Sequence, residues 1–129
     1  MKKIHAAIGI IFNQDTQNIL VTKRRSEQVY AGYWELPGGK IEINESSLIA
    51  VVRELKEELG ITIITAEFLN TVNYQYPEFL VTLEVFKITD YSGIAHGREG
   101  QEITWVDLKN INNISPLLPA SQDILSLLI

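Results

Sequence analysis

The segment between Ser46 and Gly60 constrains the fold more than any other part of the chain. Serine is a common helix N-cap and glycine a common helix C-cap, so the segment is predicted to be one α-helix. At about 100° per residue, Glu54, Glu57 and Glu58 share one side of that helix. The apolar residues are Leu48, Val52, Leu55 and Leu59, with Val51 at the edge of the group. One side of the helix is therefore acidic, and the other must pack against the protein.

The acidic side is unfavourable for the helix itself. Glu54 and Glu58 form an i,i+4 like-charge pair, which costs a few tenths of a kcal/mol. Glu57 and Glu58 lie in the last turn, where the helix dipole disfavours anions by about 0.3–1 kcal/mol. A solvated acidic face is the alternative, but stability does not favour this arrangement. A divalent cation would turn the repulsion into a ligand set, because Mg²⁺ and Mn²⁺ prefer carboxylate oxygens. The pattern predicts a metal site for Mg²⁺, with Mn²⁺ as a substitute.

Two neighbouring features fit such a site. Arg53 lies one turn before Glu57, so an i,i+4 ion pair could orient that carboxylate, although a plain surface arginine is the alternative. Pro37-Gly38-Gly39 precedes the helix. Its two glycines permit a tight loop and close approach of the backbone, but an ordinary turn would use the same residues.

The spacing of these residues resembles that of the Nudix family. The sequence reads Gly39, five residues, Glu45, seven residues, and then Arg-Glu-Leu-Lys-Glu-Glu-Leu-Gly-Ile up to Ile61. The likeness is of the MutT type and covers the chain almost end to end. The further segments that carry it are Met1-Lys2-Lys3, Thr22-Lys23-Arg24, Glu35-Leu36-Pro37, Tyr74-Gln75-Tyr76-Pro77, Gly97–Gln101 with Trp105, and Pro119-Ala120. The resemblance implies one Nudix domain over residues 1–129.

The resemblance also implies a role for individual residues. The metal ligands would be Gly38, through its carbonyl, Glu54, Glu57, Glu58 and Glu99. Glu54 is expected to orient or deprotonate the attacking water, and Arg53, Glu57 and Glu58 complete the catalytic set. Glu45 and Gly39 are expected to support them. Glu99 lies outside the helix, where an exposed loop acid is the alternative, and its flanking glycines favour a mobile loop.

The nucleotide would bind beside these carboxylates. The expected substrate-binding residues are Arg24, Glu35, Leu36, Pro37, Gly38 and Ser121. Lys23 and Arg25 are expected to point to the opposite face by strand alternation. Leu36 and Ser121 depart from the Phe and Asn of the oxidised-guanine enzyme. Because a hydroxyl reads a base edge less completely than an amide, base specificity stays open.

The reaction implied by the resemblance is hydrolysis of a nucleoside 5′-triphosphate to the monophosphate and pyrophosphate. The MutT likeness points to 8-oxo-dGTP as the substrate, and so to nucleotide-pool sanitation and DNA repair. One alternative is a broader pyrophosphohydrolase acting on CTP, dCTP or mixed triphosphates. Another is a nucleotide-sensing module without turnover, which would not need three carboxylates gathered on one helix face.

The amino-acid composition limits which ligands and partners the protein can bind. A chain of 129 residues that is 46% apolar is expected to form one domain with a core. The absence of cysteine excludes disulfides and Cys-zinc sites. A net charge of −5 argues against binding a nucleic-acid polymer, whereas a metal ion could bridge the protein to a small polyphosphate. The apolar run from Ala6 to Phe12 is shorter than a membrane span. A cytoplasmic monomer is expected.

Secondary structure is predicted from periodicity and from turn residues. Residues 4–12 and 18–23 are expected to form an antiparallel hairpin, and residues 34–36 a short extended piece. Further strands are expected at 61–76, 79–89 and 101–106, and a second helix from Pro119 to Ile129. Strands mixed with two helices predict an α+β fold of the Nudix type, an α/β/α sandwich with a mixed central sheet.

Overall fold

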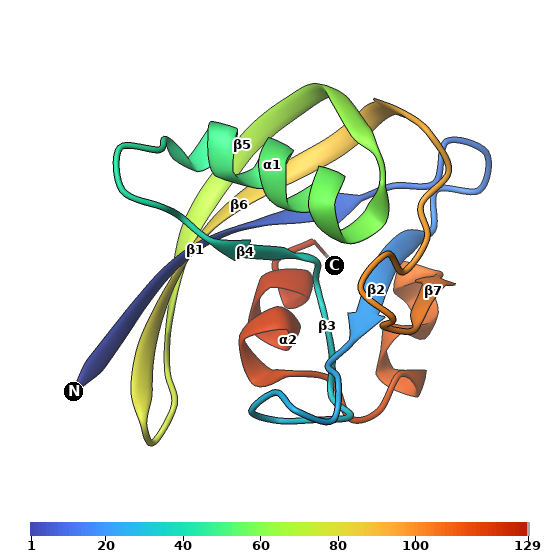
Figure 1. Cartoon of the computed structure of the whole chain (residues 1–129). Helices are drawn as coiled ribbons and strands as arrows, with labels where there is room; N and C mark the ends of the chain where they lie inside the picture. Colours follow the sequence, from blue (N-terminus) through green and yellow to red (C-terminus); the bar gives the residue numbers. More distant parts are fainter. Residues whose placement is uncertain (129) are drawn as a thin grey trace.

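A computed structural model of the protein describes residues 1–128, which form two β-sheets flanked by helices (Figure 1). The strands are β1 (Lys2–Ile11), β2 (Ile19–Lys23), β3 (Trp34–Glu35), β4 (Gly38–Lys40), β5 (Thr62–Gln75), β6 (Phe79–Ser92) and β7 (Ile103–Val106). The helices are α1 (Ser47–Leu59), the short 3₁₀ helix η1 (Leu108–Asn113) and α2 (Pro119–Ser126).

The larger sheet has the order β4-β1-β6-β5 and is mixed, because β1 pairs parallel with β6 and antiparallel with β4. Side chains of β1 alternate between its two faces. Ala6 and Ile8 belong to the core shared with α2, while Ala7 and Ile11 belong to the core under α1. The two helices therefore cover opposite faces of this sheet (Figure 1), as the predicted α/β/α sandwich requires.

The predicted hairpin between residues 4–12 and 18–23 is wrong, although both strands exist. β1 and β2 meet only at an isolated bridge between Phe12 and Ile19. β6 pairs along the whole of one edge of β1, and β4 occupies the other edge at Ala6–Ile8, in the middle of the predicted hairpin. Instead β2 is the centre of a second, antiparallel sheet of order β3-β2-β7. The sequence pattern identifies strands but not their partners.

Helix α1 has the predicted ends but a different buried face. The Ser46 hydroxyl accepts a hydrogen bond from the Ile49 N–H at 3.1 Å, and Gly60 ends the helix in the left-handed conformation at φ 71°. Val51 is fully buried, whereas Leu48 is 48% and Val52 37% exposed. The predicted burial of Leu48 and Val52 is therefore wrong. The stripe that packs on the sheet consists of Ala50, Val51, Leu55 and Leu59.

Helix α2 agrees with the prediction except in length, whereas the sequence pattern does not predict the 3₁₀ helix η1. Pro119 is the first residue of α2, as expected, but the helix ends at Ser126 rather than continuing. Ile129, the predicted helix end, lies outside the described residues. Within residues 1–128 no helix is long and apolar enough to cross a membrane.

Adjacent valines on α1 test this assignment of the buried face. Val51→Ala removes fully buried methyl groups and should lower the free energy of unfolding by about 1–3 kcal/mol. The matched control Val52→Ala should change it by no more than about 0.5 kcal/mol, because the side chain is partly exposed. Urea unfolding of both variants measures the difference. Equal losses at the two positions would contradict the packing described here.

Candidate active site

A cavity of about 450 Å³ is lined by residues of both sheets and both α-helices. Small-molecule sites commonly have volumes of roughly 300–1,000 Å³. One end is apolar, where Ile4 and Ala6 of β1 lie in register with Val81 and Leu83 of β6. The other end carries four acidic residues, Glu35, Glu54, Glu58 and Glu99. The cavity therefore combines an apolar compartment with a carboxylate cluster.

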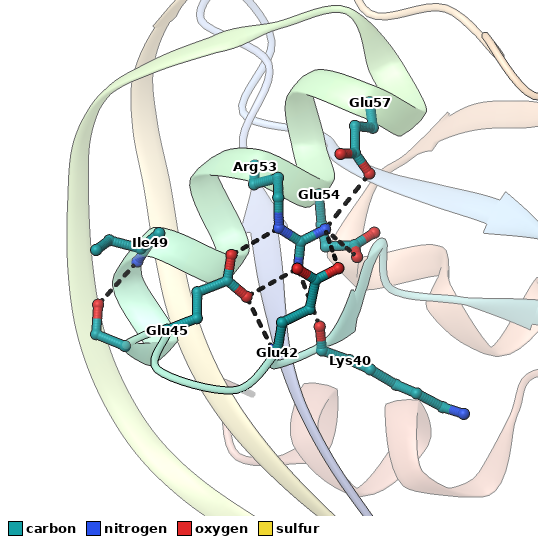
Figure 2. A network of polar contacts seen from close by, with 8 residues as sticks. Lys40, Glu42, Glu45, Ile49, Arg53, Glu54 and Glu57 are labelled. Carbon is teal, nitrogen blue, oxygen red and sulfur yellow. Dashed lines mark hydrogen bonds and ion pairs between the residues drawn. The ribbon is translucent and has the colours of Figure 1, made fainter.

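Arg53 holds the carboxylates around the entrance of α1 together (Figure 2). Its Nε donates to Glu45 Oε2 at 2.6 Å and its Nη2 to Glu45 Oε1 at 2.9 Å. Nη1 donates to Glu54 Oε1 at 2.8 Å and to Glu57 Oε2 at 3.4 Å, and Nη2 also donates to the Lys40 carbonyl at 3.1 Å. The predicted i,i+4 pair with Glu57 is confirmed, but its contact is longer than those with Glu45 and Glu54.

Hydrogen bonding within this network fixes the charge of its members. The Arg53 hydrogen bonds lower the pKa of Glu45 to about 2. The same bond, together with that to Glu54, raises the pKa of Arg53 above its usual value. Both groups are therefore ionised at neutral pH. Arg53 gives a fixed positive charge beside the acidic end of the cavity.

Two consecutive glycines leave room for the Glu54 carboxylate and for β1. A Cβ on Gly39 would lie 2.3 Å from the Glu54 carboxyl carbon, so the missing side chain provides the space that this carboxylate occupies. Gly38 has a positive φ of 153°, and a Cβ there would lie 2.2 Å from the Ala7 carbonyl oxygen. A glycine is therefore needed at position 39 to make room for the Glu54 carboxylate. A glycine is needed at position 38 because the backbone of β1 passes close by.

Glu58 carries a partly buried carboxyl group surrounded by other acidic residues. Burial, followed by the nearby charges of Glu54, Glu35 and Glu99, raises the pKa of Glu58 to about 9. A divalent cation would offset this repulsion, and carboxylate oxygens are the ligands that hard cations prefer. Within residues 1–128 no three acidic or histidine side chains already enclose an ion position. The residues fit a divalent metal by donor chemistry and by charge.

The loop that carries Glu99 is bound to the C-terminal end of α1. Arg98 donates through its backbone N–H to the Glu58 carbonyl at 3.0 Å and through Nη1 to the Lys56 carbonyl at 3.0 Å. Gln101 Nε2 donates to the Glu58 carbonyl at 3.1 Å. Both carbonyls lie in the last turn of the helix; the Lys56 carbonyl also accepts from the Gly60 N–H, whereas the Glu58 carbonyl takes its partners from the loop. The loop predicted to be mobile is thus tied to the helix that bears Glu54 and Glu58.

Arg24 lines the cavity as expected, but it is held by a neighbouring carboxylate. Its Nη1 lies 3.0 and 3.1 Å from the two carboxylate oxygens of Glu35, and its Nε donates to the Val29 carbonyl at 2.6 Å. Burial raises the pKa of Glu35, an effect that Arg24 opposes. The pair forms one polar wall of the cavity.

Arg25 also lines the cavity, so the prediction that it faces away is wrong. The Lys23 side chain agrees with the prediction, because its Nζ lies 5.8 Å from the centre of the Trp34 ring and 4.0 Å from Glu102, two residues outside the lining. Strand β2 ends at Lys23, and alternation does not apply to the residues beyond it. Arg25 Nη1 donates to the Glu99 carbonyl at 2.9 Å. The basic run therefore contacts the loop that carries Glu99.

Ser121 extends a backbone ladder between β3 and the start of α2. The Trp34 N–H donates to the Pro116 carbonyl at 2.8 Å, and the Leu118 N–H donates to the Trp34 carbonyl at 2.8 Å. The Leu118 carbonyl accepts a hydrogen bond within α2. The Leu36 N–H instead donates to the Ser121 hydroxyl at 3.1 Å, so a side-chain oxygen takes the place of a backbone acceptor. Ser121 is buried and lines the cavity.

The structure brings most of the predicted site residues to this one cavity. Those that line it are Arg24, Glu35, Leu36, Gly38, Gly39, Glu54, Glu58, Glu99 and Ser121. Those outside the lining are Pro37, Glu45, Arg53 and Glu57. Polar cavity residues not expected from the sequence are Thr22, Gln28, Lys40, Tyr76 and Gln101. Period-two alternation of Ile4, Ala6 and Ile8 is the signal that could have identified the apolar side.

Known proteins resemble this chain over nearly its whole length. The NUDIX domain model matches residues 2–128. The 8-oxo-dGTP diphosphatase of Escherichia coli (strain K12) is 38% identical over 112 residues, covering 87% of this chain and 86% of the relative. The CTP pyrophosphohydrolase of the same organism is 32% identical over 120 residues, covering 93% and 87%.

Solved structures extend the likeness to three dimensions. A MutT structure from a study of Aliivibrio salmonicida and Vibrio cholerae superposes with a TM-score of 0.83 at 36% identity, covering 99% of this chain and 98% of that one. The MutT NUDIX hydrolase from Burkholderia pseudomallei gives a TM-score of 0.87 at 28% identity, covering 98% of each chain.

The two adjacent glycines should respond differently to the same added methyl group. Gly39→Ala should weaken Mn²⁺ binding by roughly 10- to 100-fold with little change in the free energy of unfolding, because the methyl group displaces only the end of the Glu54 side chain. Gly38→Ala should lower stability, because its methyl group meets the backbone of β1. Mn²⁺ titration followed by electron paramagnetic resonance, with urea unfolding, separates the two effects. Unchanged Mn²⁺ affinity in Gly39→Ala would contradict the placement of Glu54.

Proposed function

The chain belongs to the Nudix family and is a hydrolase of phosphoanhydride bonds, and from this we propose that it converts 8-oxo-dGTP to the monophosphate and pyrophosphate. Nucleotide-pool sanitation follows as its role. The observation that carries the proposal is the two-part cavity, in which an apolar compartment adjoins a carboxylate cluster. The first part suits a nucleobase, and the second suits phosphates bridged to the protein by metal.

We propose Mg²⁺ as the metal, with Mn²⁺ as a substitute. The groups that would hold it are the Gly38 carbonyl and the side chains of Glu54, Glu57, Glu58 and Glu99. When bound, the ion neutralises phosphate charge and makes a water molecule more acidic. The Glu57 side chain is 54% exposed and contacts Arg53 at 3.4 Å, so its contribution is at the outer edge of the site.

Glu54 is the residue we assign to orienting or deprotonating the attacking water. Arg53 Nη1 holds one of its carboxylate oxygens at 2.8 Å, and the bare backbone of Gly39 borders the same carboxylate. Arg53 is itself fixed by the bidentate contact with Glu45. Glu45 and Gly39 therefore act as supporting residues, because they set the position of the group that acts on water.

Arg24, Glu35, Leu36, Pro37 and Ser121 are assigned to binding the nucleotide. Arg24 uses Nε and Nη1 within the protein, and among residues 1–128 its Nη2 has no protein acceptor. That group is free to donate to a carbonyl or a phosphate oxygen of the substrate. Leu36 and Ser121 are joined by a hydrogen bond and form the buried end of the same wall.

Pyrimidine triphosphates are the second candidate substrates. The CTP pyrophosphohydrolase of Escherichia coli covers 93% of this chain at 32% identity. Ser121 offers a hydroxyl where an amide would read an oxidised guanine at two points. These two observations make CTP and dCTP the alternative to the purine substrate.

The remaining proposals concern the setting of the reaction. We propose that residues 1–129 form one domain that acts as a monomer in the cytoplasm on small nucleotides. The net charge of −5 supports a small substrate rather than a nucleic-acid polymer or an anionic membrane surface.

A substrate panel tests the proposed function directly. Pyrophosphate release should be measured with Mg²⁺ on 8-oxo-dGTP, dGTP, dATP, dCTP and CTP. We expect the highest kcat/KM for 8-oxo-dGTP, and no release in the presence of a chelator. Higher kcat/KM for CTP or dCTP than for both guanine nucleotides would replace the purine assignment with the second candidate. Absence of release from every nucleotide would overturn the proposed activity.

A further inference from the structure

The cavity lining includes a buried tyrosine, Tyr76, in addition to the buried Ser121. Tyr76 follows β5 and is only 4% exposed, yet it lines the cavity. Its ring contacts those of Tyr30, Tyr74 and Phe79, with centroids 5.3, 4.7 and 5.1 Å away. These contacts fix the ring, so the hydroxyl has a defined position.

The Tyr76 hydroxyl binds the start of α2. It accepts a hydrogen bond from the Ala120 N–H at 3.1 Å, in a buried position. The N-cap of α2 is Leu118, whose side chain cannot accept from the first N–H groups of the helix. Tyr76 therefore supplies a partner that the helix itself lacks. The bond ties Tyr76 to the segment that presents Ser121 to the cavity.

The hydroxyls of Ser121 and Tyr76 each use their oxygen as an acceptor and keep their proton unused. Ser121 accepts from the Leu36 N–H and Tyr76 from the Ala120 N–H. Among the described residues, neither hydroxyl proton has a protein acceptor. Burial raises the pKa of Tyr76 to about 12, so its hydroxyl stays a donor at neutral pH. A buried donor without an acceptor is unfavourable, and a ligand acceptor would satisfy it.

We propose that Tyr76 is a specificity-determining residue whose hydroxyl donates to a carbonyl oxygen of the nucleobase, beside the hydroxyl of Ser121. Apolar side chains of Phe79, Val81 and Leu118 also line the cavity, so a base packed against them would meet these hydroxyls as hydrogen-bond donors. The site then favours bases with a carbonyl over bases that lack one. This inference rests on the proposed assignment of the cavity to a nucleotide.

The test compares guanine with 2-aminopurine, which lacks the carbonyl at position 6. Wild type, Tyr76→Phe and the control Tyr74→Phe are assayed on both deoxynucleoside triphosphates, and calorimetry measures binding of both monophosphates without metal. Tyr74 contacts the Tyr76 ring but does not line the cavity. Tyr76→Phe should raise KM and Kd for the guanine nucleotides by roughly 5- to 20-fold, with kcat and 2-aminopurine binding nearly unchanged. Tyr74→Phe should behave as wild type.

A purely structural role for Tyr76 predicts a different pattern. If Tyr76→Phe weakens both bases equally, or neither, the hydroxyl only caps α2 and the proposal is overturned. If that variant does not fold, Ser121→Ala takes its place: a remaining preference for guanine supports Tyr76, and equal binding of the two bases refutes it. The binding of the monophosphates is measured independently of turnover. A protein that releases no pyrophosphate would contradict the proposed function, whereas the binding data alone decide the role of Tyr76.

Discussion

The bidentate contact between Arg53 and Glu45 is the interaction on which the site depends. One guanidinium joins the loop before α1 to the helix itself, since it also binds Glu54 and the Lys40 carbonyl. Without it, neighbouring carboxylates on one helix face would repel one another. Because a guanidinium presents several donors in one plane, it can hold two carboxylates at once. Arg53 therefore fixes Glu54 at the acidic end of the cavity beside Gly39.

The rest of the fold places the apolar part of the cavity next to these carboxylates. β1 packs against both helices, because its side chains alternate between the core under α1 and the core shared with α2. The same strand borders the cavity through Ile4, Ala6 and Ile8. α2 adds Ser121, and the loop carrying Glu99 closes the acidic end through its bonds to α1. The same strand thus contributes to both cores and to the cavity lining.

Features that depend on nearby residues were predictable from the sequence. The ends of α1 at Ser46 and Gly60 and the Arg53–Glu57 pair follow from local spacing, and the structure agrees with each. Features that depend on distant partners were not. The edges of β1 are taken by β4 and β6, which no local pattern reveals. The role of Ser121 in the ladder with Leu36 joins positions far apart in the sequence, so only the folded chain shows it.

Replacement of Arg53 by lysine tests the central claim most directly. Lysine keeps the charge but has a single ammonium group, which cannot bind Glu45 in bidentate fashion and Glu54 as well. The measurement is kcat for Mg²⁺-dependent pyrophosphate release by wild type and Arg53→Lys, with circular dichroism to confirm folding. If Arg53 positions Glu54, kcat should fall by about 10²-fold in a folded protein. A folded Arg53→Lys variant with wild-type kcat would contradict this account.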